Sequence, residues 1–162
     1  MTLESLRDYI AENSLEFIEA RDSTDVPLAA IDANQIFLRE FQNPVHSVAV
    51  LLDPGDVTTE WVTMQEPTYF VPVDVYVFAQ RDTEAVSRQR ARALALALRD
   101  CLRQHPDFMT TEGLDEYDGV EAKADTKACK IRVIFETAGE SDEPGLYPSE
   151  DLLPGEYLYP RG

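Results

Sequence analysis

The stretch YFVPVDVYVFAQRDTEAVSRQRARALALALRDCL, residues 69–102, combines the clearest strand of the chain with its clearest helix. Alternate residues of its first part are almost all valine, as in a strand with one buried face. Ala and Leu then fill a helical segment over residues 82–104, which Asp82 or Thr83 can cap and Pro106 ends. The valine face and the apolar side of this helix are expected to pack together.

The flanking segments predict one domain built around this unit. Residues 3–20 have helical spacing, weakened in the middle by Asn13-Ser14. Asp53-Pro54-Gly55-Asp56 predicts a turn that joins strands on either side into a hairpin. Residues 113–119 suggest a loop, and CKIRVIFET, residues 129–137, a final strand.

These segments predict an α+β fold, an α/β sandwich with a mainly antiparallel four-stranded sheet. The N-terminal helix and the long helix are expected to pack on that sheet. Residues 1–138 form the single expected domain, and residues 139–162 an extended acidic arm rich in Tyr and Pro.

The second face of the long strand is unusually aromatic. It carries Phe70, Tyr76 and Phe78, whereas a half-exposed antiparallel sheet normally presents polar groups on its outer face. Two explanations are open. The first helix or the 26–41 segment of the same chain covers this face, or a second subunit does, since aromatic residues are enriched in interface cores.

An arginine stripe follows the long helix. At 100° per residue the side chains of one narrow sector are those of Arg81, Arg88, Arg92, Arg99 and Arg103. Residues 81–103 contain six arginines and three acids, 6 − 3 = +3, so the rest of the chain carries −20. Such a stripe is most simply a solvated helix face. Alternatively, it receives acidic groups from another segment.

The C-terminal stretch GLYPSEDLLPGEYLYP, residues 145–160, offers such acidic groups together with several apolar ones. A purely solvated tail has little use for its tyrosines and leucines. We therefore expect the arm to lie along a neighbouring subunit, with docking on its own domain as the competing possibility. The candidate interface residues are Phe70, Tyr76, Phe78, Arg88, Arg92, Arg99, Arg103, Leu146, Tyr147, Tyr157 and Tyr159.

The net charge of −17 argues against affinity for nucleic acid or for an anionic membrane. It suits an ordinary solubilised protein, a partner for basic surfaces, or a wall that DNA passes without binding. No stretch is long and apolar enough for a transmembrane helix, and the N-terminus lacks a signal-peptide pattern. The two cysteines, Cys101 and Cys129, are expected to be buried free thiols in a reducing compartment.

Catalytic motifs are missing. The chain has no HExxH, GxSxG, Walker-type loop or GxGxxG, so we expect no enzyme, cofactor or metal site. Cys101 and His105 are four residues apart on a helix, which more often means core and cap than nucleophile and base. The acids of residues 115–121 lack EF-hand spacing and predict a solvated loop.

The order of these segments resembles that of phage tail terminator and minor tail proteins, including the lambdoid tail terminators. The resemblance covers residues 1–137. It depends on the N-terminal helix, NQIFLREFQNPVHSVAVLLDPGD, residues 69–102 and KIRVIFET. It does not extend to the arm.

The resemblance implies a virion protein of the head–tail junction, assembled in the host cytoplasm. Six copies would form a ring that caps the tail tube, ends its polymerisation and contacts the head connector or head-closure protein. DNA would pass through the acidic bore without specific binding. The alternatives are a head-closure or tail-completion protein at the same junction, an acidic inhibitor that mimics DNA and, last, an intracellular enzyme of unknown class.

Overall fold

The computed structural model describes residues 1–39, 47–61, 67–118 and 126–138. In chain order its elements are α1 (Leu3–Asn13), α2 (Leu15–Glu19), a 3-10 turn η1 (Ala33–Gln35), β1 (Ile36–Leu38), β2 (Val48–Pro54), β3 (Thr58–Trp61), β4 (Pro67–Ala79), α3 (Glu84–Leu102), β5 (Phe108–Asp118) and β6 (Lys127–Ala138).

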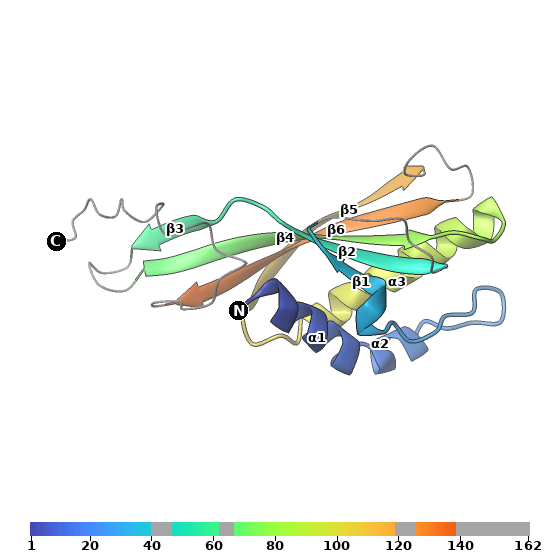
Figure 1. Cartoon of the computed structure of the whole chain (residues 1–162), viewed down its shortest axis with the longest axis horizontal. Helices are drawn as coiled ribbons and strands as arrows, with labels where there is room; N and C mark the ends of the chain where they lie inside the picture. Colours follow the sequence, from blue (N-terminus) through green and yellow to red (C-terminus); the bar gives the residue numbers. More distant parts are fainter. Residues whose placement is uncertain (40–46, 62–66, 119–125, 139–162) are drawn as a thin grey trace.

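The described strands form one sheet in the order β1-β2-β4-β6-β5, and β3 pairs with the first residues of β4 (Figure 1). β1 runs parallel to β2, whereas every other pair is antiparallel. The α+β class predicted from the sequence is confirmed. The sheet is mainly antiparallel, as predicted, but it has six strands rather than four and contains one parallel pair.

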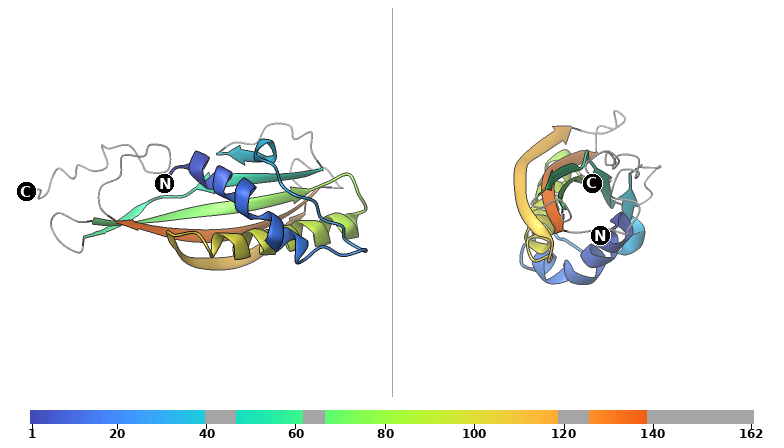
Figure 2. Two further views of the ribbon diagram at one scale, coloured as in Figure 1. Left: turned by 90° about the horizontal axis from the view of Figure 1, so that it is seen from below. Right: turned by 90° about the vertical axis from the view of Figure 1, so that its left-hand side faces the viewer.

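The helices lie together on one face of the sheet (Figure 2). This is the valine face of β4, where Val71, Val73, Val75 and Val77 are fully buried. α3 packs on β4 and β6 and brings Leu94, Leu98 and Leu102 into the same core. α1 adds its own buried residues, so the two-layer arrangement follows directly from the two apolar periodicities.

The helix boundaries agree with the capping signals of the sequence. The Oγ1 of Thr83 accepts a hydrogen bond of 3.3 Å from the Val86 amide and so caps α3. The N-terminal helical segment is divided at the buried Ser14 into α1 and α2, as the weak middle predicted. Arg81 adopts a left-handed φ of 68° in the connection from β4 to α3.

The expected hairpin at Asp53-Pro54-Gly55-Asp56 is not formed. β2 and β3 follow each other along the same side of β4, and both are antiparallel to it. The Gly55 amide donates a 2.8 Å hydrogen bond to the Pro72 carbonyl, which keeps the chain on the β4 ladder. Pairing with a 13-residue strand therefore overrides the local turn signal.

Residues 113–118, expected in a loop, belong to β5. β5 is an edge strand that pairs with β6, and its register shifts between Phe108 and Thr110 and again between Glu112 and Asp115. Gly113 has a φ of 66° at the second shift, a conformation that glycine adopts without steric strain. This segment has a composition typical of a loop, but its pairing with β6 makes it a strand.

Candidate interaction surfaces

The face of the sheet opposite the helices carries side chains from four neighbouring strands. The register aligns Phe37 of β1, Leu51 of β2, Tyr76 of β4 and Lys130 of β6 in one row across the sheet. All four are partly exposed. We call this side of the sheet the open face, because the described helices all lie on the other side.

The predicted aromatic residues of β4 all belong to the open face but differ in exposure. Phe70 and Tyr76 are partly exposed, whereas Phe78 is only 6% exposed. The Tyr76 and Phe78 rings stack with centroids 6.2 Å apart, and Lys130 Nζ lies 5.9 Å from the Tyr76 centroid. Phe78 therefore contributes to packing within the chain, while Phe70 and Tyr76 remain partly accessible.

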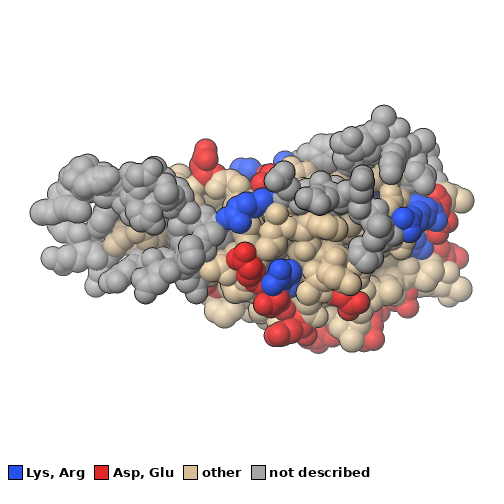
Figure 3. All heavy atoms as spheres, in the orientation of Figure 1, with Lys and Arg blue, Asp and Glu red and all other residues tan. Residues whose placement is uncertain are grey.

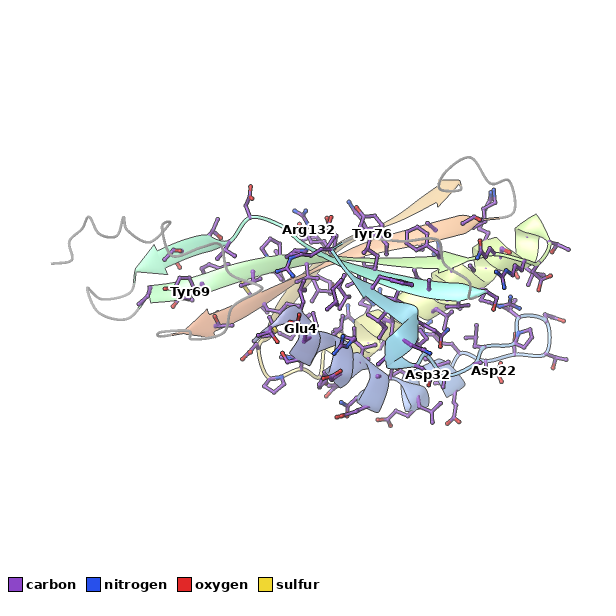
Figure 4. The ribbon with its side chains drawn as sticks, in the orientation of Figure 1. Glu4, Asp22, Asp32, Tyr69, Tyr76 and Arg132 are labelled. Atoms are coloured by element: carbon purple, nitrogen blue, oxygen red, sulfur yellow. The ribbon has the colours of Figure 1, made fainter. Side chains whose placement is uncertain are left out.

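A charged row lies beside the aromatic one. The register aligns Asp53, Asp74, Arg132 and Glu112 across β2, β4, β6 and β5. Arg132 donates two hydrogen bonds to Asp74, Nε to Oδ1 at 2.8 Å and Nη2 to Oδ2 at 3.1 Å. Figure 4 shows Arg132 and Tyr76 projecting from the sheet away from the helices.

This row shifts the pKa of two of its members. Burial and the charge of Asp74 raise the pKa of Asp53, against a smaller opposing effect of Arg39. The hydrogen bonds and charge of Asp74 raise the pKa of Arg132. Asp74 is only 9% exposed, so its carboxylate depends on Arg132 for compensation in a partly dehydrated position.

Beyond the charged row the open face becomes apolar again. Pro72 of β4 is aligned with Ile134 of β6, and both are partly exposed. Three residues of the open face were not predicted from the sequence: Phe37, Leu51 and Ile134. Leu51 and Ile134 are apolar residues out of phase with the buried alternation of their strands, and that signal could have identified them.

The outer side of α3 carries the predicted arginine stripe. Arg88, Arg92 and Arg103 are exposed and Arg99 is partly exposed. We call these four residues the arginine ridge. α3 covers the valine face of the sheet. The ridge and the open face therefore lie on opposite outer sides of the molecule. Arg81 precedes the helix and is not part of the ridge.

One carboxylate lies at the C-terminal end of the ridge. Asp100 forms ion pairs with Arg21 at 2.8 Å, Arg99 at 3.5 Å and Arg103 at 3.7 Å. Burial alone would raise the pKa of Asp100, but the hydrogen bonds and charges of Arg21 and Arg99 lower it overall. Three guanidinium groups therefore share this carboxylate.

Acidic side chains dominate the outer side of the two N-terminal helices. They recur every three or four residues and are exposed: Glu4, Asp8, Glu12, Glu16 and Glu19. Figure 3 shows Asp and Glu gathered along this helical edge of the molecule. This acidic row was not predicted, although the spacing of its members in the sequence places them near one another on a helix.

Cys101 and His105 occupy structural positions. Burial raises the pKa of the Cys101 thiol to about 12, which keeps it protonated. The His105 ring packs edge-on against Tyr9 and Phe135, and its Nδ1 accepts a 3.0 Å hydrogen bond from the Asp107 amide. These contacts favour the interpretation of core and cap. Cys101 and Cys129 are both buried free thiols, as expected.

Several predictions concern residues outside the described ranges. The four arm residues Leu146, Tyr147, Tyr157 and Tyr159 are among them, as are His46 and the acids beyond residue 118. Within the described ranges, no group of three or more His, Cys, Asp or Glu is placed to hold a metal ion. No helix of the described chain is both long and apolar enough to cross a bilayer.

No protein family matches the chain, and a search of curated proteins finds no significant match.

Proposed function

We propose that this chain is a structural virion protein, a tail terminator whose copies form a ring on the end of a phage tail tube. The single observation that carries the proposal is the pair of unlike surfaces on opposite layers of the protomer. The open face is partly apolar, and the ridge is cationic. A closed ring needs such a head-to-tail contact between two different surfaces.

The open face has the composition expected of an interface core. Phe70, Tyr76, Leu51 and Ile134 are all partly exposed in a single protomer. Aromatic residues are enriched where protein surfaces meet, and a partner would remove this area from water. A contact between copies is therefore the proposed role of the open face.

The charge of the chain supports the proposed position of the ring at the head–tail junction, where DNA passes through its bore. Six copies would carry 6 × −17 = −102, and the acidic side of α1 and α2 contributes exposed carboxylates to this total. DNA carries one negative charge per about 1.7 Å of its axis, so an acidic wall repels it and lets it slide. A ring at the head–tail junction needs this property.

Tail-tube polymerisation tests the proposal. Purified tube protein of the same phage is assembled with and without the full chain, and tube lengths and ends are recorded by electron microscopy. We expect shorter tubes that each carry a ring at one end. Tubes of unchanged length with bare ends would contradict the proposal.

A matched pair of variants links this activity to the open face. Ile134→Glu introduces a charge into the apolar part of that face and should abolish termination. Met109→Glu makes the same type of change at a side chain that is 46% exposed on the edge strand β5, and should leave termination intact. Circular dichroism establishes that both variants are folded.

A further inference from the structure

His105 lies where four elements of the fold meet. It follows the end of α3, and its amide donates a 3.0 Å hydrogen bond to the Leu102 carbonyl. Its ring packs edge-on against Tyr9 of α1, with centroids 4.7 Å apart, and against Phe135 of β6, with centroids 5.3 Å apart. Its carbonyl accepts a 3.0 Å hydrogen bond from the amide of Phe108, the first residue of β5. His105 therefore contacts α1, α3, β5 and β6.

The hydrogen bond at Nδ1 requires the neutral form of His105. Nδ1 accepts a 3.0 Å hydrogen bond from the Asp107 amide, so this nitrogen carries no proton of its own. Protonation would place a second N–H group opposite the amide and a positive charge in a half-buried position. The Glu136 amide donates a 2.8 Å hydrogen bond to the Asp107 carbonyl. Because β6 holds the turn in this way, the His105 ring has to move when Nδ1 becomes a donor.

The titratable groups around His105 come from three parts of the chain. The N-terminus and α1 supply the Met1 amine and the Tyr9 phenol, α3 supplies the Cys101 thiol, and the turn supplies Asp107. From β6 the group that faces the ring is the apolar side chain of Phe135. Burial raises the pKa of Tyr9 and raises that of Cys101 to about 12. Both groups therefore stay neutral when the pH falls from neutral to mildly acidic.

Acidification adds positive charge at this position. Burial lowers the pKa of His105, Asp107 opposes this effect, and the Met1 amine adds to it. Burial also lowers the pKa of the Met1 amine, again with Asp107 in opposition. As the pH falls, the imidazole and the amine both become charged, and the two cations repel each other.

α1 depends on side-chain contacts for its place in the fold. It has 11 residues, which is too short for a helix that is stable in isolation. Leu3, Leu6 and Ile10 are fully buried on its inner side. The Tyr9 hydroxyl donates a 3.3 Å hydrogen bond to the Cys101 carbonyl of α3. A local opening of α1 can therefore occur without unfolding of the sheet, and a weaker contact at Tyr9 makes that opening more frequent.

We propose that His105 makes the docking of α1 pH-sensitive: protonation of its imidazole weakens the contact between α1 and the end of α3, while α3 and the sheet keep their structure. The neutral ring accepts the hydrogen bond of the turn and supports Tyr9, whereas the imidazolium ring cannot do both. α1 also carries three carboxylates of the acidic row: Glu4, Asp8 and Glu12. Acidification would therefore loosen the element that presents them. This role of His105 does not require a ring of subunits.

Hydrogen exchange of the full chain, followed by mass spectrometry, tests this role. The exchange is measured at about pH 7.5 and about pH 5.5, on either side of the usual histidine pKa of about 6.5. Exchange times are adjusted for the intrinsic pH dependence of amide exchange. We expect the protection of α1 to fall severalfold at the lower pH and that of α3 and β4 to stay unchanged. The loss should follow the protonation of His105, recorded by an NMR titration of its imidazole.

Four variants separate titration from packing. His105→Phe keeps an aromatic ring that cannot be protonated, and His105→Asn makes the same comparison with a smaller side chain. In both, α1 should be equally protected at the two pH values. Asp107→Asn keeps the backbone amide that binds Nδ1 but removes the carboxylate that raises the pKa of His105, so the loss should move to lower pH. Tyr9→Phe removes only the hydroxyl and should weaken the protection of α1 by the same factor at both pH values.

Three results would overturn the proposal. The first is unchanged protection of α1 at the lower pH. The second is a loss that persists in both His105 variants, because the titrating group would then lie elsewhere. The third is a loss spread evenly over α1, α3 and β4, which would mean that acid destabilises the whole fold rather than the docking of one helix.

Discussion

Asp74 and Arg132 face each other across β4 and β6 and are joined by two parallel hydrogen bonds of 2.8 and 3.1 Å. Asp74 is nearly buried, whereas the Arg132 side chain is 39% exposed. The pair lies in the middle of the open face, between the aromatic row and Ile134. It therefore fixes both the register of two central strands and the polarity of the proposed contact surface.

Arg132→Met leaves the Asp74 carboxylate without compensation in a dehydrated position. We expect the free energy of unfolding to fall by about 2 kcal/mol, as urea denaturation would measure. Replacing both residues by Val should be less damaging than the single change, because no buried charge remains. A double variant with a lower free energy of unfolding than Arg132→Met would contradict this explanation. Arg7→Met, beside the exposed Asp8, serves as control and should cost about 0.5 kcal/mol or less.

Asp53→Asn should stabilise the protein at neutral pH. Burial and the charge of Asp74 raise the folded-state pKa of Asp53, so its ionised form is less favourable in the folded than in the unfolded chain. This penalty is present at pH values above the folded pKa and disappears as the pH falls below the unfolded one. Unfolding measured at several pH values should show the advantage of Asp53→Asn shrinking on acidification. An advantage independent of pH would refute this explanation.

His105→Asn should reduce the loss of stability on mild acidification. Burial lowers the pKa of His105, with a smaller further lowering by the N-terminal amine and an opposing effect of Asp107. The folded protein then binds fewer protons than the unfolded chain, so stability falls as the pH drops from about 7 to about 5. Protonation of Nδ1 would also remove the acceptor of the Asp107 amide.

The chain offers a matched control for this prediction, since His46 is its other histidine. Thermal unfolding of His105→Asn and His46→Asn is compared with that of the natural sequence over the same pH range. His105→Asn should flatten the curve near pH 6, close to the usual histidine pKa of about 6.5. An unchanged slope in His105→Asn would show that the acid sensitivity arises elsewhere.

Gly113→Ala should destabilise the protein by about 1 kcal/mol through backbone strain, because φ is positive there. A Cβ at this position would meet no atom within 4 Å, so crowding contributes nothing. Denaturant unfolding should show this loss for Gly113→Ala and little change for the neighbouring exposed Glu112→Ala. If both substitutions had the same small effect, the register shift at Gly113 would not depend on glycine.

The core of the fold was predictable from local periodicity. One strand has an apolar residue at every second position, namely Val71, Val73, Val75 and Val77, and Leu94 and Leu98 recur with helical spacing. Strand and helix therefore each have one apolar face, and the two faces were expected to pack together. The α+β class and the two-layer arrangement followed from these short-range patterns. The same alternation placed Phe70, Tyr76 and Phe78 on one face, as the structure confirms.

The remaining features depend on pairing between distant segments. Asp53-Pro54-Gly55-Asp56 has the composition of a turn, but the Gly55 amide binds the Pro72 carbonyl and the chain continues along β4. β5 is a strand because β6 supplies its partners. The hydrogen bonds between Arg132 and Asp74 need a strand register that no single segment encodes. The burial of Phe78 depends on neighbouring residues that the alternation does not reveal.

Native mass spectrometry of the full chain, alone and with tail tubes, tests most directly the claim that copies of this chain contact one another through the open face. We expect one discrete closed oligomer, on its own or at the tube end, that Ile134→Glu abolishes and Met109→Glu preserves. A monomer under both conditions, or an oligomer indifferent to Ile134→Glu, would contradict it.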